Sequence, residues 1–427
     1  MMKTASGTKM KRIKLYWQIR TMLLLWLTYA TFYIGRVNMS VALPAIQEGQ
    51  GWGSHRVGLI GAVFFWVYAV GQLINGQLGD RFSSRIFVFC GLLGTALMNG
   101  LFAKASSLLL LVIIWGINGY FQSTGWGPIV KTASKWVDRE HYNIASVILG
   151  TSFVIGSTFS WYISGQLLEK YNQWELLFRI PSLALLVMAI IWVVFLRNTP
   201  SEVGLAKSSE EEVNVEAVTS HPGGKLKYPI LRRAFVFLQE PFLRLIALIT
   251  VIAGMFKEGL TLWAPTLISQ SQGLTPSEAV KYSLAVPLMG LVGVFIGGWL
   301  HHILEDEAKT LIVLFGAGVL ASIGVLLTMD MGNPILLGLS LGSCAMVSHG
   351  INVIIVSLIP MHYTDRASSL AGFLDFCSYI GAGIMSVVTG ITLQLWSWTG
   401  VLVMWVVLNT MGVTLMSRGR LKLRSRG

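Results

Sequence analysis

Residues 22–46 read "MLLLWLTYATFYIGRVNMSVALPAI", a stretch of 25 residues that contains a single charge, Arg36. A run of this length and composition can cross the hydrocarbon core of a bilayer as one helix. A cation near the middle of such a helix costs on the order of 3 kcal/mol on insertion scales, so it normally faces a cavity and has a function there. The stretch therefore predicts a membrane helix, and Arg36 predicts a polar cavity beside it.

Similar apolar stretches recur along the whole chain of 427 residues, of which 54% are hydrophobic and 12% are charged. A soluble domain carries about twice that charged fraction. We predict an all-α polytopic membrane protein with twelve transmembrane helices in two pseudo-symmetric six-helix halves. The predicted spans are 20–46, 57–79, 86–104, 107–131, 143–168, 176–196, 242–269, 279–300, 309–328, 335–359, 368–394 and 397–416.

The basic residues are unevenly divided between the two sides of these helices. With both termini cytoplasmic, 25 of the 32 Lys and Arg are cytoplasmic, five are on the outer side, and Arg36 and Lys257 lie within spans. This bias follows the positive-inside rule, and it explains the net charge of +12 without a nucleic-acid partner. We therefore predict a multi-pass protein with both termini in the cytoplasm.

A long polar stretch at 197–240 separates the first six spans from the last six. Its Glu-, Ser- and Lys-rich composition is typical of a cytoplasmic linker. The predicted parts are an N-terminal six-helix half (1–196), the linker (197–240) and a C-terminal six-helix half (241–427).

The first helix of each half carries a cation, a hydroxyl and a proline at steps of four residues: Arg36, Ser40 and Pro44, then Lys257, Thr261 and Pro265. Equal depth in matching helices predicts that the two cations face each other across a central cavity. Two fixed cations there favour an anion between them, and the arginine fork matches phosphate or carboxylate oxygens. Glu258 follows Lys257 directly, but adjacent helical residues point about 100° apart, so we expect them to pair poorly. A structural ion pair of Arg36 with Asp375 or Glu258 is the alternative.

Further polar and aromatic side chains recur at helical spacing and predict wet helix faces around this cavity. An intramembrane carboxylate needs a partner or a proton, and Lys257 and Arg36 are the candidate partners of Asp375. The other side chains could equally hold helices together. The candidate substrate-binding residues are Arg36, Lys257, Tyr29, Tyr33, Tyr68, Gln122, Ser152, His349, Asn352, Asp375 and Tyr379.

The loop after the second span reads "GQLGDRFSSR", from Gly76 to Arg85. Its glycines permit close helix packing, Asp80 can cap or pair at a helix end, and Arg81 and Arg85 can anchor at cytoplasmic headgroups. The chain contains no P-loop, H-E-x-x-H, Cys/His cluster or G-x-S-x-G motif. We therefore expect no enzyme activity, no catalytic residue, no metal site and no cofactor.

The loop motif resembles that of the major facilitator superfamily, and the chain looks like its organophosphate:phosphate antiporters. The matching stretches are "TFYIGRVNMSVALP", "GWGPIVKTASKW", "RNTPSEVGL" and "FKEGLTLWAP". The resemblance implies the major facilitator fold, a phosphate-binding role for Arg36, and cavity positions for Tyr29, Tyr33, Tyr68 and Tyr379. The chain departs from the pattern with Lys257 where an arginine is usual, Gln72 where some members have lysine, Ser152 where some have histidine, and Gly127-Pro128 for paired prolines.

We thus expect a secondary transporter that exchanges a sugar phosphate or glycerol phosphate for inorganic phosphate. The alternatives are a proton-coupled carboxylate transporter that uses Asp375 or His349, and a carrier-like sensor of hexose phosphate. The expected partners are the small anionic substrate, phosphate and lipid, with a monomer in a bacterial plasma (inner) membrane.

Overall fold

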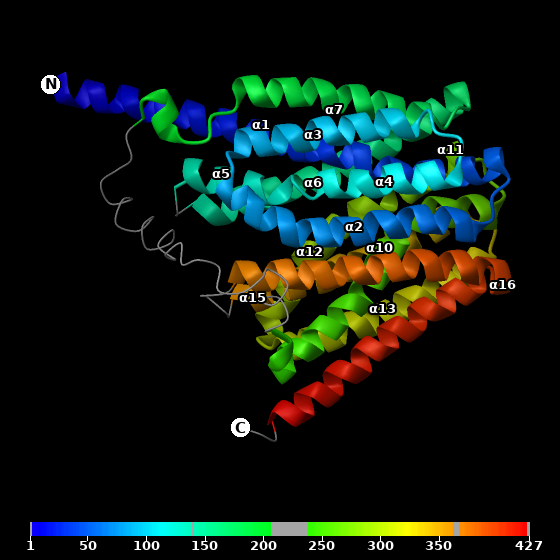
Figure 1. Ribbon diagram of the computed structural model, residues 1–427. Helices are drawn as coiled ribbons and strands as arrows, with labels where there is room; N and C mark the ends of the chain where they lie inside the picture. The colour runs from blue at the N-terminus through cyan, green and yellow to red at the C-terminus, as the bar shows by residue number, and fades with distance from the viewer. Residues whose placement is uncertain (1, 139–140, 206–236, 362–366, 425–427) are drawn as a thin grey trace.

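The computed structural model describes residues 2–138, 141–205, 237–361 and 367–424, which fold into long helices joined by short turns (Figure 1). The predicted linker lies mostly outside these residues. The first set of helices is α1 (Met2–Gln50), α2 (Ser54–Arg81), α3 (Ser84–Phe102), α4 (Leu108–Gln122), α5 (Trp126–Trp136), α6 (Tyr142–Tyr171) and α7 (Leu176–Phe195). The second set is α10 (Pro241–Gln272), α11 (Pro276–Ser283), α12 (Ala285–Leu304), α13 (Glu307–Met329), α14 (Pro334–Val353), α15 (Ile359–Met361) and α16 (Ala367–Arg424).

Each of the twelve predicted spans corresponds to a helix or to two consecutive helices. Nine stretches of the described residues are long and apolar enough to cross a membrane, and one of them, Leu370–Arg418, holds the last two predicted spans. The two remaining spans are helices α1 and α6, with 49 and 30 residues. The predicted all-α membrane architecture is therefore confirmed.

Helix α16 contains two spans because its backbone leaves the helical region at Trp396 and Ser397. Its 58 residues would extend about 87 Å as one straight helix, far more than a hydrocarbon core of about 30 Å. Ser397 has φ 58°, a left-handed conformation that a side chain rarely adopts. The chain reverses there (Figure 1), which agrees with the predicted boundary between 394 and 397.

The two sets of helices lie beside each other, with both termini at the same end of the bundle (Figure 1). Helix α2 packs along α16, α1 packs against α10, and α6 packs against α11 and α12. Large apolar side chains cover the outer surface; Leu109 and Leu320, for example, are 69% and 71% exposed. Such exposure suits a surface that contacts lipid rather than water.

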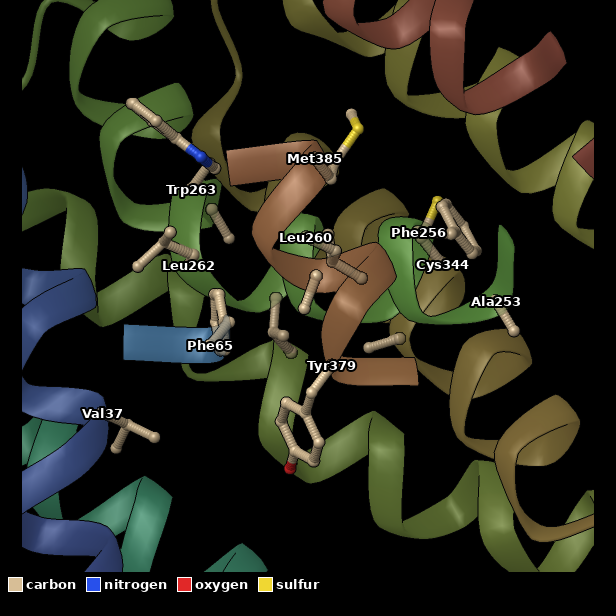
Figure 2. Packing of buried hydrophobic residues seen from close by; sticks show 14 of the residues in the cluster. Val37, Phe65, Ala253, Phe256, Leu260, Leu262, Trp263, Cys344, Tyr379 and Met385 are labelled. Atoms are coloured by element: carbon tan, nitrogen blue, oxygen red, sulfur yellow. The ribbon is translucent and has the colours of Figure 1, made fainter. Parts of the chain in front are cut away.

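Helices α10 and α16 pack closely because a glycine of one meets the backbone of the other. A Cβ at Gly254 would collide with the backbone carbonyl of Ser378. Apolar side chains around this contact include Phe256, Leu260 and Met385, all essentially buried (Figure 2). Small residues at such interfaces let membrane helices approach closely and gain van der Waals contact.

Candidate functional site

A cavity of about 1060 Å³ lies between the two sets of helices. Its lining comes from α1, α2, α5 and α6 on one side and from α10, α12, α14 and α16 on the other. It extends to Arg81 and Lys131, near the end of the bundle that carries the termini. The cavity is thus shared by both halves and approaches one face of the membrane.

Arg36 lies in this cavity with 8% of its surface exposed. Its Nη2 donates a hydrogen bond to the Tyr379 hydroxyl at 2.7 Å. The guanidinium carbon lies 4.5 Å from the ring centre of Tyr68 and 5.1 Å from that of Tyr379. A guanidinium has five N–H donors, so most of its donor capacity is available to a ligand.

The Arg36–Tyr379 contact joins the two halves, because α1 carries one residue and α16 the other. Figure 2 shows the Tyr379 hydroxyl pointing away from the apolar side chains around it. No carboxylate of the described residues forms an ion pair with Arg36. A buried arginine whose hydrogen-bond partner is neutral is poised to take an anion.

The backbone of α1 around Arg36 is held by polar side chains from neighbouring helices. Asn99 and Asn118 donate to the Gly35 carbonyl at 3.1 and 3.3 Å. Gln122 donates to the Phe32 carbonyl at 3.0 Å, and Trp161 donates to the Val37 carbonyl at 3.1 Å. These bonds fix the turn of α1 that carries Arg36. Gln122 therefore has a structural role, because its side chain holds the α1 backbone.

Lys257 and Glu258 form an ion pair, with Nζ and Oε1 2.8 Å apart. The expectation that these adjacent residues pair poorly is therefore wrong. The Cα–Cβ directions do diverge, but four and three flexible side-chain bonds allow both charged ends to bend to a common point. Since Glu258 is 7% exposed, the pair is well shielded from water, and it reduces the positive charge that Lys257 offers to a ligand.

Asp375 lines the same cavity but pairs with neither predicted partner. Lys257 binds Glu258 and Arg36 binds Tyr379, and within the described residues the Asp375 carboxylate has no hydrogen bond or ion pair. Lys257, Arg36 and Glu258 are the charged groups that act on it. Asp375 is thus an unpaired carboxylate in an otherwise mixed-charge cavity.

Aromatic rings form the wall beside Arg36. The ring of Tyr29 lies 4.6 Å from Trp126 and 5.4 Å from Tyr33, centre to centre. Tyr33 lies 5.8 Å from Phe153, which stacks on His349 at 6.2 Å with an interplanar angle of 5°. Such a wall can hold the apolar body of a ligand or a cationic group.

Some of the other predicted site residues line the cavity, and two are buried away from it. Tyr68, Asn352, Gly76 and Arg81 line the cavity, and Tyr68 accepts a hydrogen bond from Gln72 at 2.6 Å. Ser152 and Gln122 are buried away from it, with the Ser152 hydroxyl donating to the Leu149 carbonyl.

Arg85 of the loop motif is not part of the cavity lining. It lies in the first turn of α3, and its Nε donates to the Val193 carbonyl in α7 at 2.5 Å. Asp80 belongs to α2, but its side chain lies outside the described residues. The predicted headgroup contacts of Arg81 and Arg85 stay a prediction, since no lipid is present.

Sequence reasoning missed two aromatic lining residues, Trp126 and Phe153. Phe153 directly follows the predicted Ser152, so the prediction chose the wrong face of α6 by one residue. Phe153, Ser157 and Trp161 recur at steps of four and all line the cavity. That stripe is the signal that could have found them.

The comparisons with known proteins cover most of the chain. A family model described as the Major Facilitator Superfamily matches residues 25–386. The glycerol-3-phosphate transporter of Bacillus subtilis is 25% identical over 390 residues, 89% of this chain and 87% of that protein. A probable hexose phosphate transport protein of Chlamydia trachomatis is 24% identical over 90% of this chain and 87% of its own length. The membrane sensor protein UhpC of Escherichia coli is 23% identical, over 90% and 88%.

A solved structure has the same fold. It is a bacterial homolog of the human lysosomal transporter Spinster, in an inward-facing and unoccupied conformation. The TM-score is 0.75, with 16% sequence identity, and the match covers 95% of this chain and 98% of that one.

Proposed function

Because this chain belongs to the Major Facilitator Superfamily, a family of secondary transporters and not of enzymes, we propose that the central cavity binds its transported substrate. The substrate that we propose is a phosphorylated small metabolite, a sugar phosphate or glycerol phosphate, exchanged for inorganic phosphate. The names of relatives that match about 90% of the chain support this substrate class.

The observation that carries the proposal is the state of Arg36. It is a buried cation at mid-membrane depth, surrounded by tyrosines, with most of its donors unused and no carboxylate bound to it. A planar fork of this kind matches two phosphate oxygens at once. Lys257, which reaches the cavity from the opposite half, supplies a second cation, and its ion pair with Glu258 reduces the positive charge that it offers to the ligand.

Transport would use the contacts between the halves. At the end opposite the termini, Lys281 of α11 pairs with Glu169 of α6 at 3.2 Å. This ion pair crosses between the halves, and because it is exposed it is weak enough to break. At the same end, within the second set of helices, Trp398 of α16 donates to Gln270 of α10 at 3.0 Å. We propose that parts 1–196 and 241–427 rock about the bound anion, which opens that end and closes the cavity at the other.

The topology and assembly follow from the same proposal. Both termini are cytoplasmic in the positive-inside assignment, so the cavity approaches the cytoplasmic face. The protein acts as a monomer in a bacterial plasma membrane, with lipid, phosphate and the organophosphate as its partners.

Exchange in proteoliposomes tests the function. Liposomes are loaded with unlabelled phosphate, radiolabelled phosphate is added outside, and its entry is followed with and without a protonophore. Fast entry that needs internal phosphate and ignores the protonophore supports antiport. No exchange by folded, inserted protein contradicts it.

A second candidate is a proton-coupled transporter of organic anions, which the unpaired Asp375 favours. Uptake would then collapse with the protonophore and would not require internal phosphate. The third, a sensor, is favoured by the likeness to a membrane sensor protein. Ligand binding without flux would identify it.

A further inference from the structure

The charged side chains at the centre of the cavity sum to zero. These are the cations Arg36 and Lys257 and the carboxylates Glu258 and Asp375. Two more cations, Arg81 and Lys131, line the part of the cavity near the termini and are not included in this sum. A phosphate monoester adds up to two negative charges to this site. A ligand that brings only negative charge therefore leaves Asp375 close to like charge, which is unfavourable.

The position of Asp375 relative to Arg36 is set by one turn of α16. Tyr379, which receives the hydrogen bond from Arg36, follows Asp375 by four residues on the same helix face. Side chains at this spacing have Cβ atoms about 6 Å apart. A small ligand whose phosphate lies at Arg36 can therefore reach the Asp375 carboxylate with a group two or three bonds away.

Lys257 does not satisfy Asp375, because its ammonium is already held by Glu258 at 2.8 Å. The Asp375 carboxylate needs a donor that the described residues do not provide. A cationic donor is favoured over a hydroxyl since it also restores the charge balance.

We propose that the transported organophosphate carries an ammonium group, which pairs with Asp375 while the phosphate binds Arg36. Within the class of phosphorylated small metabolites, this inference puts a short aminoalkyl phosphate in place of the sugar phosphate or glycerol phosphate named above, and it rests on the proposed exchange of an organophosphate for inorganic phosphate. Asp375 is then the specificity-determining residue that separates such zwitterions from phosphate esters of neutral alcohols.

The test is competition against labelled phosphate exchange in proteoliposomes by two nearly isosteric esters, 2-aminoethyl phosphate and 2-hydroxyethyl phosphate. The full-length wild type is expected to be inhibited by the aminoethyl ester at a concentration at least tenfold lower. Equal inhibition by both esters overturns the inference and leaves the proposed function standing. If neither ester competes, the inference is overturned as well, whereas the absence of any phosphate exchange is the separate result that contradicts the proposed function.

The variant Asp375→Asn keeps the side-chain shape and removes the charge. It is expected to reduce the preference, measured as the ratio of the two esters' inhibition constants, to less than threefold, whatever the rate at which the variant exchanges phosphate. The control is Asp330→Asn, at an exposed carboxylate that ends α13, and it should keep the full preference. If Asp375→Asn protein still prefers the aminoethyl ester, the assignment of Asp375 as the ammonium partner is overturned. The assignment is also overturned if the only change in the variant is that its transport no longer depends on a proton gradient. The wild-type comparison decides the inference even if the variant does not fold.

Discussion

Replacing Arg36 is the sharpest test of the anion site. In the proposed complex, its fork donates two charge-assisted hydrogen bonds to phosphate, each worth about 1.5–3 kcal/mol. Arg36→Ala should therefore cost roughly 3–6 kcal/mol of binding, a loss of about 10²–10⁴ in affinity. Arg36→Lys keeps the charge but not the fork, so we expect a loss of about 10–100-fold.

The same substitution should change the stability of the anion-free protein little. Arg36 donates a hydrogen bond to the neutral Tyr379, for which a net contribution of about 1 kcal/mol is usual. Its guanidinium also lies against the rings of Tyr68 and Tyr379, a kind of contact worth about 0.5–2 kcal/mol. Removing a buried cation that has no carboxylate partner offsets part of that loss. A loss of binding with nearly unchanged thermal stability thus separates a ligand role from a structural one.

Calorimetric titration of phosphate into the purified protein gives the dissociation constant, and initial rates of exchange give the transport defect. Arg179→Ala is the matched control, because Arg179 is an exposed arginine in α7. Arg36→Ala protein that binds and exchanges phosphate within threefold of the wild type would refute the reasoning. A variant that unfolds would instead point to a structural role.

Glu258→Gln should tighten phosphate binding roughly tenfold, measured by the same titration, because it releases the charge of Lys257; weaker binding would contradict this. Gly254→Ala should lower the melting temperature, since its Cβ meets the Ser378 backbone carbonyl and overpacking costs about 1–3 kcal/mol, whereas Gly298→Ala, with nothing within 4 Å, should not. At the contact of Lys14 and Asp138, partial burial opposes ionisation, but hydrogen bonds from Lys14 and Gln18 outweigh it and lower the pKa of Asp138. Its contribution to stability is therefore present above the usual carboxyl pKa of about 3.9 and is lost as the pH falls through the lowered pKa. The difference in melting temperature between wild type and Asp138→Asn should accordingly be small near neutral pH and should shrink further as the pH falls below the usual carboxyl pKa of about 3.9, and a difference that grows with acidity would oppose it.

Much of the site could be predicted because polar residues in a membrane span are costly and therefore conspicuous. Arg36, Lys257, Asp375 and His349 were chosen on that ground, and all four line one cavity. Whether they bind substrate stays a prediction. Ser152 is predicted only from the resemblance, since some family members have a histidine there, and it lies on a buried face of α6. A shift of one residue turns a helix by about 100°, which is why Phe153 and not Ser152 lines the cavity.

The amino-acid sequence by itself determined the helices, their membrane location and the reversal near Ser397, because hydropathy and helix length are summed over neighbouring residues. Only the tertiary structure decided which charges are paired: Lys257 with its neighbour Glu258, Arg36 with Tyr379 across the two halves, and Asp375 with none of the described residues. These pairings depend on helix rotation and on side-chain rotamers to within about an ångström, because a hydrogen bond is formed or lost over that distance. Helix rotation and side-chain rotamers cannot be predicted to that precision from a local pattern of residues.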